Sequence, residues 1–494
     1  MSDIKEFEGI GLFERTFAQQ INPVNGKIQE LDFLFRRRFG SGEGEWPVEP
    51  DRYRLIWMPG CPYSNKAVIT WKLLGLNRVI SLGTTGILRS PKGWVFSEDR
   101  EERDPVLGVH YLHDIYTRSY PDYTGRSTVP TIADEREGVA VNNDPLMIPT
   151  YFATAWRPYH KEHAPELYPE ELAEQIEKAN AWITAKINAY KCGFARSQEQ
   201  YDHGYDSYFT AMEQLERYLA DRRFLFGDYI TLSDIHLYVC LVRFYMVYNL
   251  IFKANKKRLV DYPNLWGYAR DLYQTEGFRE YTRFDQIKKH YQLSPHLRAL
   301  FGNEYGIYAE GPEIWPWEQP HGREQLSGKT EKFRYQQEDR TQFQHRDPAQ
   351  ELTYIRQYLQ KPIERAGQAT NQGEYERWYH VVFDELDTLD RLLGNRRYLL
   401  GESLTQADSL LYQELQRLDY IYYYAYKLNK RKVGEYPNLE RYRRELQEHP
   451  EIADSVQIEQ ERDTYYRQQD AVRNPYHIVP RGPEPNHRQE EKES

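Results

Sequence analysis

The chain has 494 residues, and domains of roughly 150 residues would divide it into about three. Its 65 basic and 75 acidic residues give a formal net charge of −10, which argues against sequence-independent binding to nucleic acid or to an anionic membrane surface. Three cysteines are too few for a disulfide framework, and no N-terminal segment has the pattern of a secretory signal. We therefore expect a protein of the reducing cytoplasm.

One apolar stretch, residues 237–252, has to be weighed as a membrane segment. It is short for a lipid bilayer, and it carries Arg243 and Asn249. A buried helix explains the stretch better, so we expect no membrane-spanning segment.

The regular part of the chain begins after an irregular N-terminal extension. Residues 1–50 contain several glycines and no hydrophobic period. Residues 53–57 predict a strand, residues 62–74 a helix and residues 78–82 a second strand. This order suits a parallel pair of strands joined by a helix.

A third strand is predicted over residues 127–132, where Pro130 interrupts it. Proline within a strand marks an edge, a bulge or a cis peptide bond. If the bond before Pro130 is cis, the backbone of Val129 is exposed at a strand edge and can pair with a peptide-like ligand. A plain edge strand is the alternative.

From about residue 169 onward the pattern is helical, and it occurs twice. A constant shift of 174 residues aligns residues 222–227 (RRFLFG) with 396–401 (RRYLLG), and residues 262–265 with 436–439 (both YPNL). The shift holds without a gap over a long span, which indicates that one helical unit has been duplicated. Each copy also contains a Thr N-cap with an Asp three residues later, a structural helix-start motif: Thr231 with Asp234, and Thr405 with Asp408.

The chain contains 42 tyrosines, an excess typical of helices that pack through amphipathic side chains. Several of them occur at matched positions of both copies, so we expect these to have a packing role. They are Tyr201 and Tyr375, Tyr248 and Tyr422, and Tyr262 and Tyr436.

Cys61 is the strongest candidate for chemistry. It follows a predicted strand and Gly60, and Pro62 stands at the first position of the predicted helix. The free N–H groups and the dipole of a helix N-terminus favour negative charge, so a thiol here should hold a larger thiolate fraction than a free cysteine. A small buried hydrophobic residue is the alternative interpretation. Cys240 lies in the apolar helix and is expected in the core.

Other kinds of chemistry have less support. Position 64 is Ser, so there is no Cys-x-x-Cys motif, and disulfide exchange at Cys61 requires an external thiol. The 14 histidines and three cysteines show no metal-ligand spacing, so we expect no metal site. Cys192 lies close to Tyr190, and its role is open.

A series of motifs resembles the glutathione transferases that have a thioredoxin-like N-terminal domain, and more closely their Xi class, the glutathionyl-hydroquinone reductases. The motifs cover about residues 10–312: RYRL at 52–55, Cys61-Pro62, KLLGL at 72–76, GWVF at 93–96, YTGRSTVP at 123–130, VNN at 141–143, YKCGFA at 190–195, Arg243-Phe244 with Tyr248, and IKKHY at 287–291. The ordered series is far more specific than the Cys-Pro pair alone. It implies an α/β thioredoxin-like N-terminal domain followed by an all-α glutathione-transferase C-terminal domain, here with the helical domain duplicated.

The resemblance also implies a glutathione site. In that family the cysteine is the nucleophile, which corresponds to Cys61. A Trp, an Arg and the backbone of a Val before Pro hold glutathione, and they correspond to Trp94, Arg126 and Val129. The family's acidic residue after the second strand pair corresponds to Asp144, which is also assigned to thiol binding.

Aromatic residues of the family's helical domain line the quinone pocket, and they correspond to Tyr190 and Tyr291. The implied reaction begins when the Cys61 thiolate attacks the sulfur of a glutathionyl-hydroquinone. The hydroquinone leaves, and a second thiol resolves the mixed disulfide that remains on Cys61.

The chain departs from the family pattern at the γ-glutamyl position. The family has Asn-Glu-Ser, whereas this chain has Asn143, Asp144 and Pro145, so the acid is shorter, a hydroxyl is missing and proline lacks an N–H. We predict weaker glutathione binding or the use of a different low-molecular-weight thiol. Tyr245 also replaces an Asp that follows the family's Arg-Phe pair.

The domain prediction has six parts. They are an N-terminal extension (1–50), a thioredoxin-like domain (51–160), a helical domain (165–312), a polar linker (313–348), a duplicated helical domain (349–483) and a charged, disordered tail (484–494).

The second helical copy is predicted not to be a second active site. The shift places Glu364 at the position of Tyr190, and no thioredoxin-like half precedes the second copy. The resemblance implies a dimer, because members of the family look like dimers that are joined through their helical domains. We therefore expect residues 350–460 to replace the helical domain of a partner, which makes one chain a monomeric pseudo-dimer.

The leading interpretation is a cytoplasmic, thiol-dependent reductase. Its partners are a small quinone conjugate and glutathione or a related thiol, with no nucleic acid and no membrane. Two alternatives stay open: a non-catalytic, tyrosine-rich scaffold of the same fold, and a relative of the thioltransferase or dehalogenase type.

Overall fold

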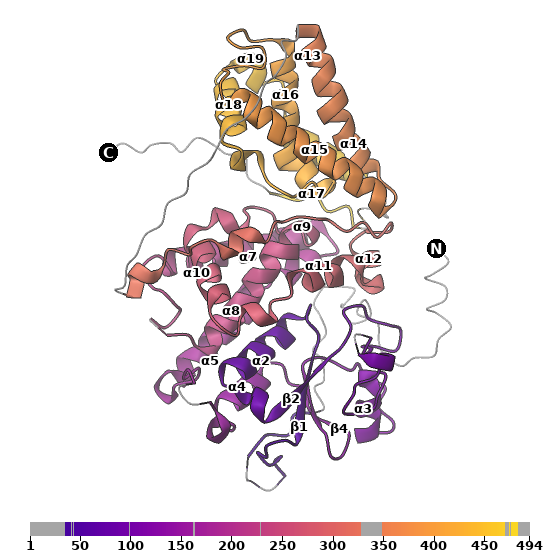
Figure 1. Cartoon of the computed structure of the whole chain (residues 1–494), viewed down its shortest axis with the longest axis vertical. Helices are drawn as coiled ribbons and strands as arrows, with labels where there is room; N and C mark the ends of the chain where they lie inside the picture. The colour runs from indigo at the N-terminus through magenta and orange to yellow at the C-terminus, as the bar shows by residue number, and fades with distance from the viewer. Residues whose placement is uncertain are drawn as a thin grey trace. The chain divides into compact units, whose positions relative to one another are not determined.

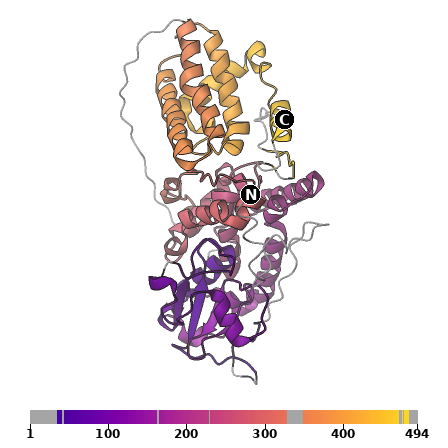
Figure 2. The same cartoon turned by 90° about the vertical axis from the view of Figure 1, so that its right-hand side faces the viewer.

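The computed structural model describes residues 35–482, apart from residues 41, 43, 98, 162–163, 228, 328–347, 470–473 and 475. Most of the predicted N-terminal extension, part of the predicted linker and the predicted tail lie outside the described residues. The chain divides into two units (Figures 1 and 2). The first comprises Met1–Ala254, Arg258–Phe301 and Trp315–Thr330, and the second comprises Asn255–Lys257, Gly302–Ile314 and Glu331–Ser494.

A four-stranded mixed sheet forms the N-terminal part of the first unit. Its strands are β1 (Tyr53–Trp57), β2 (Ile80–Thr84), β3 (Thr131–Asp134) and β4 (Val139–Asn142), in the order β2-β1-β3-β4. β1 and β2 are parallel, as the predicted strand-helix-strand unit requires, whereas β3 is antiparallel to both β1 and β4. All five residues of β1 are buried, which agrees with a central strand covered on both faces.

Helices cover both faces of this sheet. Figure 1 shows α2 (Pro62–Leu73) and α4 (Met147–Ala153) on one side and α3 (Leu112–Ser119) on the other. α2 begins directly after Cys61 and connects β1 to β2. The sheet therefore places the start of α2 beside the turn before β3, where Val129 and Pro130 lie.

The rest of the first unit is helical. Its helices are α5 (Ala173–Lys186), α6 (Tyr190–Gly193), α7 (Gln198–Tyr218), α8 (Leu232–Arg243), α9 (Asn249–Ile251), α10 (Pro263–Gln274), α11 (Phe284–Leu293) and α12 (Pro295–Leu300). A π-helical turn, Phe244–Tyr248, continues α8 into α9. α8 packs against both α2 and α5, so the buried helix predicted for the apolar stretch joins the helical part to the thioredoxin-like part.

The same stretch has the length and hydropathy of a membrane span. Leu232–Ile251 has a mean hydropathy of 1.2, and 78% of its most apolar window is buried inside the structure. That burial is typical of the core helix of a folded domain.

The second unit is all-helical. Its helices are α13 (Pro348–Ile355), α14 (Lys361–Gln368), α15 (Gln372–Leu393), α16 (Gln406–Arg417), α17 (Tyr423–Ala425), α18 (Pro437–Gln447), α19 (Pro450–Ala453) and α20 (Ile458–Gln468). α15 packs against α14, α13 packs against α16, and α18 contacts both α15 and α16. Leucines, isoleucines and tyrosines of these helices form one continuous core.

The duplication extends to single hydrogen bonds. Asp234 accepts bonds from Leu225 N (2.9 Å), from Thr231 N (2.8 Å) and from the Tyr268 hydroxyl (2.8 Å). Asp408 accepts the matched bonds from Leu399 N (2.9 Å), Thr405 N (2.8 Å) and the Tyr442 hydroxyl (2.8 Å). Both predicted Thr–Asp motifs are therefore complete capping boxes.

Part of the segment predicted as a linker, from Trp315 onward, belongs to the first unit. Trp317 is fully buried and meets the rings of Trp266 (5.0 Å between centroids) and Tyr245 (5.3 Å). Tyr245 also stacks on Trp266, with ring planes 6° apart. The aromatic side chain that replaces the family's Asp therefore helps to hold this segment in place.

Candidate active site

Cys61 is the N-cap residue of α2, and Pro62 follows it at the first helical position. The Cys61 thiol is partly exposed, and its Sγ donates a hydrogen bond to the carbonyl oxygen of Val129 (3.6 Å). The Val129–Pro130 peptide bond is cis, one of the three outcomes that the proline predicts. The structure thus brings together two predicted site residues that are 68 positions apart.

The loop before Cys61 is fixed by the helical part of the first unit. Arg243 of α8 is fully buried, and its guanidinium donates to the carbonyl oxygens of Pro59 (3.2 Å) and Gly60 (3.2 Å) and to Oδ1 of Asn65 (2.7 Å). A side chain on Gly60 would place its Cβ 2.7 Å from Cβ of His290. Glycine is therefore needed at position 60 for the close approach of α11.

Trp94 lies in the same hydrophobic cluster as Val129, and Cys61 packs against this cluster. The indole is 3% exposed, and its Nε1–H has no hydrogen-bond acceptor among the described residues. A buried donor without an acceptor is costly, so the indole is suited to donate to a bound ligand. The guanidinium of Arg89 lies 5.8 Å from the centre of the Trp94 ring.

Two buried arginines, Arg126 and Arg89, lie in this region. Burial lowers the pKa of the Arg126 guanidinium, and the charge of Cys61 opposes that shift. Burial also lowers the pKa of Arg89, and the charge of Arg126 lowers it further. Arg126 therefore lies within electrostatic range of both Cys61 and Arg89, and the two guanidinium groups favour an anionic ligand group in this region.

Three tyrosine hydroxyls from separate helices form a hydrogen-bonded cluster. The Tyr291 hydroxyl lies 2.5 Å from that of Tyr190 and 3.1 Å from that of Tyr248, and Tyr248 donates to Tyr190 at 3.5 Å. Burial raises the pKa of Tyr190 most, and the charges of Tyr291 and Cys61 raise it further. Burial raises the pKa of Tyr291 to about 12. The cluster is therefore neutral, within electrostatic range of Cys61, and able to donate hydrogen bonds.

The structure includes two residues in this region to which the sequence assigned no site role. Tyr248 completes the tyrosine cluster, although its match in the second copy pointed to packing alone. His290 lies between Trp94 and Tyr291, with ring centres 5.7 Å and 5.1 Å away. The His290 Nδ1–H donates to the carbonyl oxygen of Ile87 (2.8 Å). The sequence signal that could have identified His290 as a site residue is its place in the IKKHY motif.

Asp144 lies at the start of α4. Its Oδ1 accepts hydrogen bonds from the backbone N–H groups of Leu146 (3.1 Å) and Met147 (3.3 Å), and Oδ2 pairs with Arg36 at 3.8 Å. The carboxylate therefore caps a helix N-terminus, and its role as a ligand to a thiol substrate stays a prediction.

The two other cysteines are less suited to attack. Cys192 is buried, and burial raises the pKa of its thiol well above the ordinary range. Burial raises the pKa of Cys240 to about 11. Among the described residues, no group of three or more His, Cys, Asp and Glu side chains is arranged to hold a metal ion.

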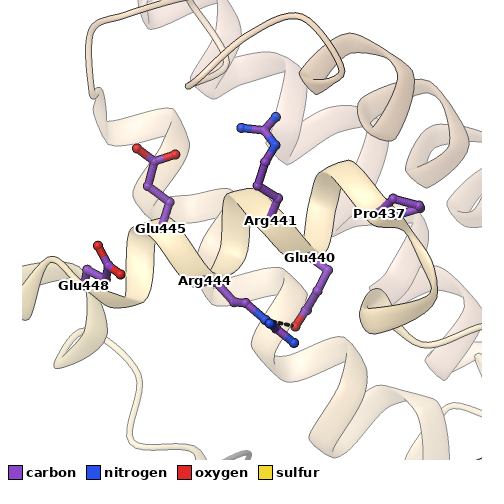
Figure 3. Close-up of a pocket in the computed structure, with 6 residues that line it drawn as sticks. All are labelled: Pro437, Glu440, Arg441, Arg444, Glu445 and Glu448. Atoms are coloured by element: carbon purple, nitrogen blue, oxygen red, sulfur yellow. Dashed lines mark hydrogen bonds and ion pairs between the residues drawn. The ribbon is translucent and has the colours of Figure 1, made fainter. Parts of the chain in front are cut away.

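Two hollows differ in character. The larger, about 540 Å³, lies on the surface of α18 and is lined by Pro437 and by charged side chains of that helix and of its C-cap residue Glu448, including the ion pair between Glu440 and Arg444 (Figure 3). The smaller, about 50 Å³, lies in the first unit and is bordered by Pro62, Tyr63, Tyr190 and Tyr248. Only the smaller one adjoins the cysteine and the tyrosine cluster.

A family model for the glutathione S-transferase C-terminal domain matches the chain twice, at residues 198–271 and 372–445. The two matches are 174 residues apart, which confirms the duplication. A curated relative, glutathionyl-hydroquinone reductase YqjG of Escherichia coli K12, is 36% identical over 313 residues, which cover 61% of this chain and 93% of the relative.

Solved structures give the same result. A glutathione transferase from Gordonia bronchialis matches with a TM-score of 0.58 and 40% identity, over 60% of this chain and 92% of that one. A Xi-class glutathione transferase from Natrialba magadii matches with a TM-score of 0.55 and 34% identity, over 59% and 91%. The glutathione-bound structure of E. coli YqjG matches with a TM-score of 0.55 and 34% identity, over 59% and 96%.

Proposed function

Because the chain belongs to the Xi-class glutathione transferases, the glutathionyl-hydroquinone reductase family, we propose that it reduces glutathionyl-hydroquinone-type conjugates with Cys61 as the nucleophile. The observation that carries the proposal is the position of the Cys61 thiol at a helix N-terminus, within electrostatic range of Tyr190 and Tyr291. A sulfur nucleophile and several phenolic hydrogen-bond donors are thus available in the same region of the first unit.

The reaction has two steps. The Cys61 thiolate attacks the sulfur of the conjugate, an S–S bond forms and the bond between sulfur and the ring carbon breaks. The electron pair stays on the ring carbon, which takes up a proton, so the ring is reduced and released as a hydroquinone. A second thiolate then attacks the sulfur of the glutathionyl group on Cys61, which releases a disulfide and restores the Cys61 thiolate.

Within this scheme the predicted residues divide between two subsites. Trp94, Arg126, Asp144 and the backbone of Val129 hold the thiol part of the substrate. The free Nε1–H of Trp94 and the charge of Arg126 support this assignment because glutathione is an anion with many acceptors. The identity of the thiol is tested by titration calorimetry with glutathione, for which we expect weaker binding than in relatives that have the Glu-Ser pair.

The tyrosine cluster forms the second subsite. Neutral phenols in hydrogen-bond contact with one another are suited to bind the oxygens of a hydroquinone and to stabilise charge as the ring carbon gains electrons. The stacked rings Phe194 on Tyr190 (7° between planes) and Phe252 on Tyr248 (7°) fix the positions of the phenols.

The experiment is a steady-state assay of hydroquinone release from a glutathionyl-hydroquinone, with glutathione in excess. We expect turnover by the wild-type protein and none by Cys61→Ser. Cys192→Ala serves as the matched control and should retain turnover. Activity that survives in Cys61→Ser would contradict the proposed nucleophile.

We also propose that the chain is a monomeric pseudo-dimer. The second unit includes residues 255–257 and 302–314, which come from the sequence of the first repeat. Within this unit Gly311 lies against Asn429, and Gly482 lies against the backbone of Asn255, so closely that a side chain on either glycine would collide. Asn255 and Asn429 are themselves related by the 174-residue shift. The tail of each repeat thus packs on the matched loop of the other repeat. This reciprocal packing supports the proposal that the second repeat takes the place of a partner subunit's helical domain.

Light scattering tests this arrangement. We expect the mass of one chain, 59.1 kDa, at all concentrations, whereas a tight dimer would contradict it. Gly482→Ala should lower the thermal stability, whereas Gly434→Ala, where a Cβ would meet open space, should not.

The proposed reaction also implies a cytoplasmic location, because both of its steps need reduced thiols.

A further inference from the structure

The 50 Å³ cavity beside the tyrosine cluster is lined in part by polar side chains that the proposed reaction does not use. Its walls come from α2, from the end of α5 and from α8. Its lining includes the polar side chains of Lys66 and His236, the thiol of Cys240 and the apolar side chains of Ile183, Ile187 and Val239.

Lys66 is a buried cation that forms no close ion pair with a described residue: Glu177 and Asp144 act on it only through longer-range charge interactions. Its side chain is 2% exposed, and its Nζ has no hydrogen bond or ion pair with any described residue. Burial lowers the pKa of Lys66 to about 8, so the charged form of this side chain still predominates at neutral pH. A buried, unpaired ammonium group is costly, and a bound anion would offset that cost.

His236 adds a second unused polar group. Its ring is 4% exposed, and Nδ1 has no hydrogen-bond partner among the described residues. Burial lowers the pKa of His236 well below its usual range, and the charge of Lys66 lowers it further. The imidazole is therefore neutral and lies near the ammonium group, where it can donate a hydrogen bond.

The second repeat shows what this position can accommodate. The 174-residue shift aligns Cys240 with Glu414, a carboxylate that is 1% exposed. Glu414 accepts hydrogen bonds from Arg417 (2.9 Å) and from Gln360 (3.1 Å). The second repeat therefore places a carboxylate at this position and pairs it with Arg417, whereas the first repeat has Cys240 there, and the cation that lines the cavity beside it is Lys66 of α2.

We propose that the cavity lined by Lys66, His236 and Cys240 is a subsite for a small carboxylate-like anion. Its volume has room for about three water molecules, and so for a carboxylate group, by the usual measure of cavity size. The anion is either a free small carboxylate or an acidic substituent on the ring of the conjugate. Only the second source rests on the proposed function.

The first arm of the test uses acetate as the probe and thermal unfolding as the readout, which does not depend on catalysis. Acetate should raise the Tm of the wild-type protein, relative to acetamide and to a chloride salt at equal ionic strength. Lys66→Met should abolish the acetate effect and should itself unfold at the same or a higher temperature, because it removes an unpaired buried charge. Lys66→Arg should restore part of the effect. Lys72→Met, on the same helix but partly exposed and paired with Glu280, should behave like the wild type.

The second arm distinguishes the two sources. If the anion is a ring substituent, a carboxylated glutathionyl-hydroquinone should have a KM about tenfold lower than its uncharged analogue, and Lys66→Met should remove this preference. Equal KM values together with an acetate effect that depends on Lys66 identify a free anion. An acetate effect that is absent, or identical in the wild type and Lys66→Met, combined with equal KM values for the two conjugates, overturns the proposal.

Discussion

Arg243 and Arg417 occupy the same position in the two helical repeats, but they bind different partners. Arg243 holds the backbone of Pro59 and Gly60, directly before Cys61. Arg417 instead binds Glu414 and Glu461 of its own repeat. One repeat thus uses the arginine to fix the loop before Cys61, and the other, which has no thioredoxin-like half before it, uses it to hold together its own helices.

Replacing Arg243 by Met should reduce activity and stability together. Three buried acceptors lose their donor, so we expect unfolding of the first unit to become easier by about 2–4 kcal/mol and turnover to fall at least tenfold. The free energy of unfolding in urea and the steady-state rate measure the two effects.

Arg417→Met is the matched control for Arg243→Met. It leaves Glu414 buried without its ion-pair partner, so the second unit should lose stability. The kcat of the protein should not change under conditions where both units stay folded. Equal losses of kcat in the two variants would mean that Arg243 acts only through general stability.

The tyrosine cluster predicts a graded series of variants. Tyr291 contacts both other hydroxyls, so Tyr291→Phe should lower kcat most, by about tenfold to a hundredfold, and Tyr248→Phe should lower it less. Tyr422→Phe, the same change at the matched position of the second repeat, should leave the kinetics unchanged. A loss of kcat in Tyr422→Phe as large as that in Tyr248→Phe would show that the tyrosine cluster is not the cause of the loss.

Alkylation should select one cysteine of the three. Burial raises the pKa of both Cys192 and Cys240, whereas Cys61 is partly exposed at a helix N-terminus. Iodoacetamide near neutral pH should therefore modify Cys61 first, and peptide mapping locates the label. Glutathione should protect the site. Preferential labelling of either of the other two cysteines would be evidence against a reactive Cys61.

Stability should fall in mild acid because of His290. Burial lowers the pKa of His290 to about 4, below the 6.5 of an unfolded histidine. The folded state therefore binds this proton less readily than the unfolded state. The contribution of neutral His290 to the free energy of unfolding is complete above pH 6.5. It is lost as the pH falls toward 4, by up to about 1.4 kcal/mol per pH unit.

His290→Asn keeps a donor for the Ile87 carbonyl and removes the titration. The variant should flatten the fall in unfolding free energy between pH 6.5 and 4, as measured by denaturant titrations at several pH values. An unchanged slope would show that other buried groups account for the acid sensitivity.

Patterns local in the chain predicted the fold well. Cys61, Pro62 and the strand-helix-strand unit follow from spacing and turn residues, and the repeat follows from one constant shift. The structure differs where the outcome depends on contacts between distant segments. Trp317 lies in a stretch, residues 313–348, that is predicted to be a linker because it is rich in Gln, Glu, Arg, Pro and Gly, but the rings of Trp266 and Tyr245, more than 50 residues earlier, pack against it.

The candidate site shows the same division. The motifs indicate that Trp94 and Arg126 belong to one site, but no pattern shows that the His290 ring lies beside that of Trp94 or that Lys66 is buried without a close ion-pair partner. Burial of a charged side chain depends on which helices meet, here α2 and α8. Helical periodicity alone assigns such residues to an exposed face.

The central claim, that Cys61 takes the glutathionyl group from a hydroquinone conjugate, is tested most directly by a single turnover without free thiol. Reduced protein is mixed with an equal amount of glutathionyl-hydroquinone, and the products are analysed by intact-mass and peptide mass spectrometry and by chromatography of the ring. We predict one released hydroquinone per chain and one glutathionyl group in disulfide linkage on Cys61, removed by added glutathione. Release of hydroquinone without a glutathionyl adduct on Cys61, or an adduct on Cys192 or Cys240 instead, would contradict the mechanism.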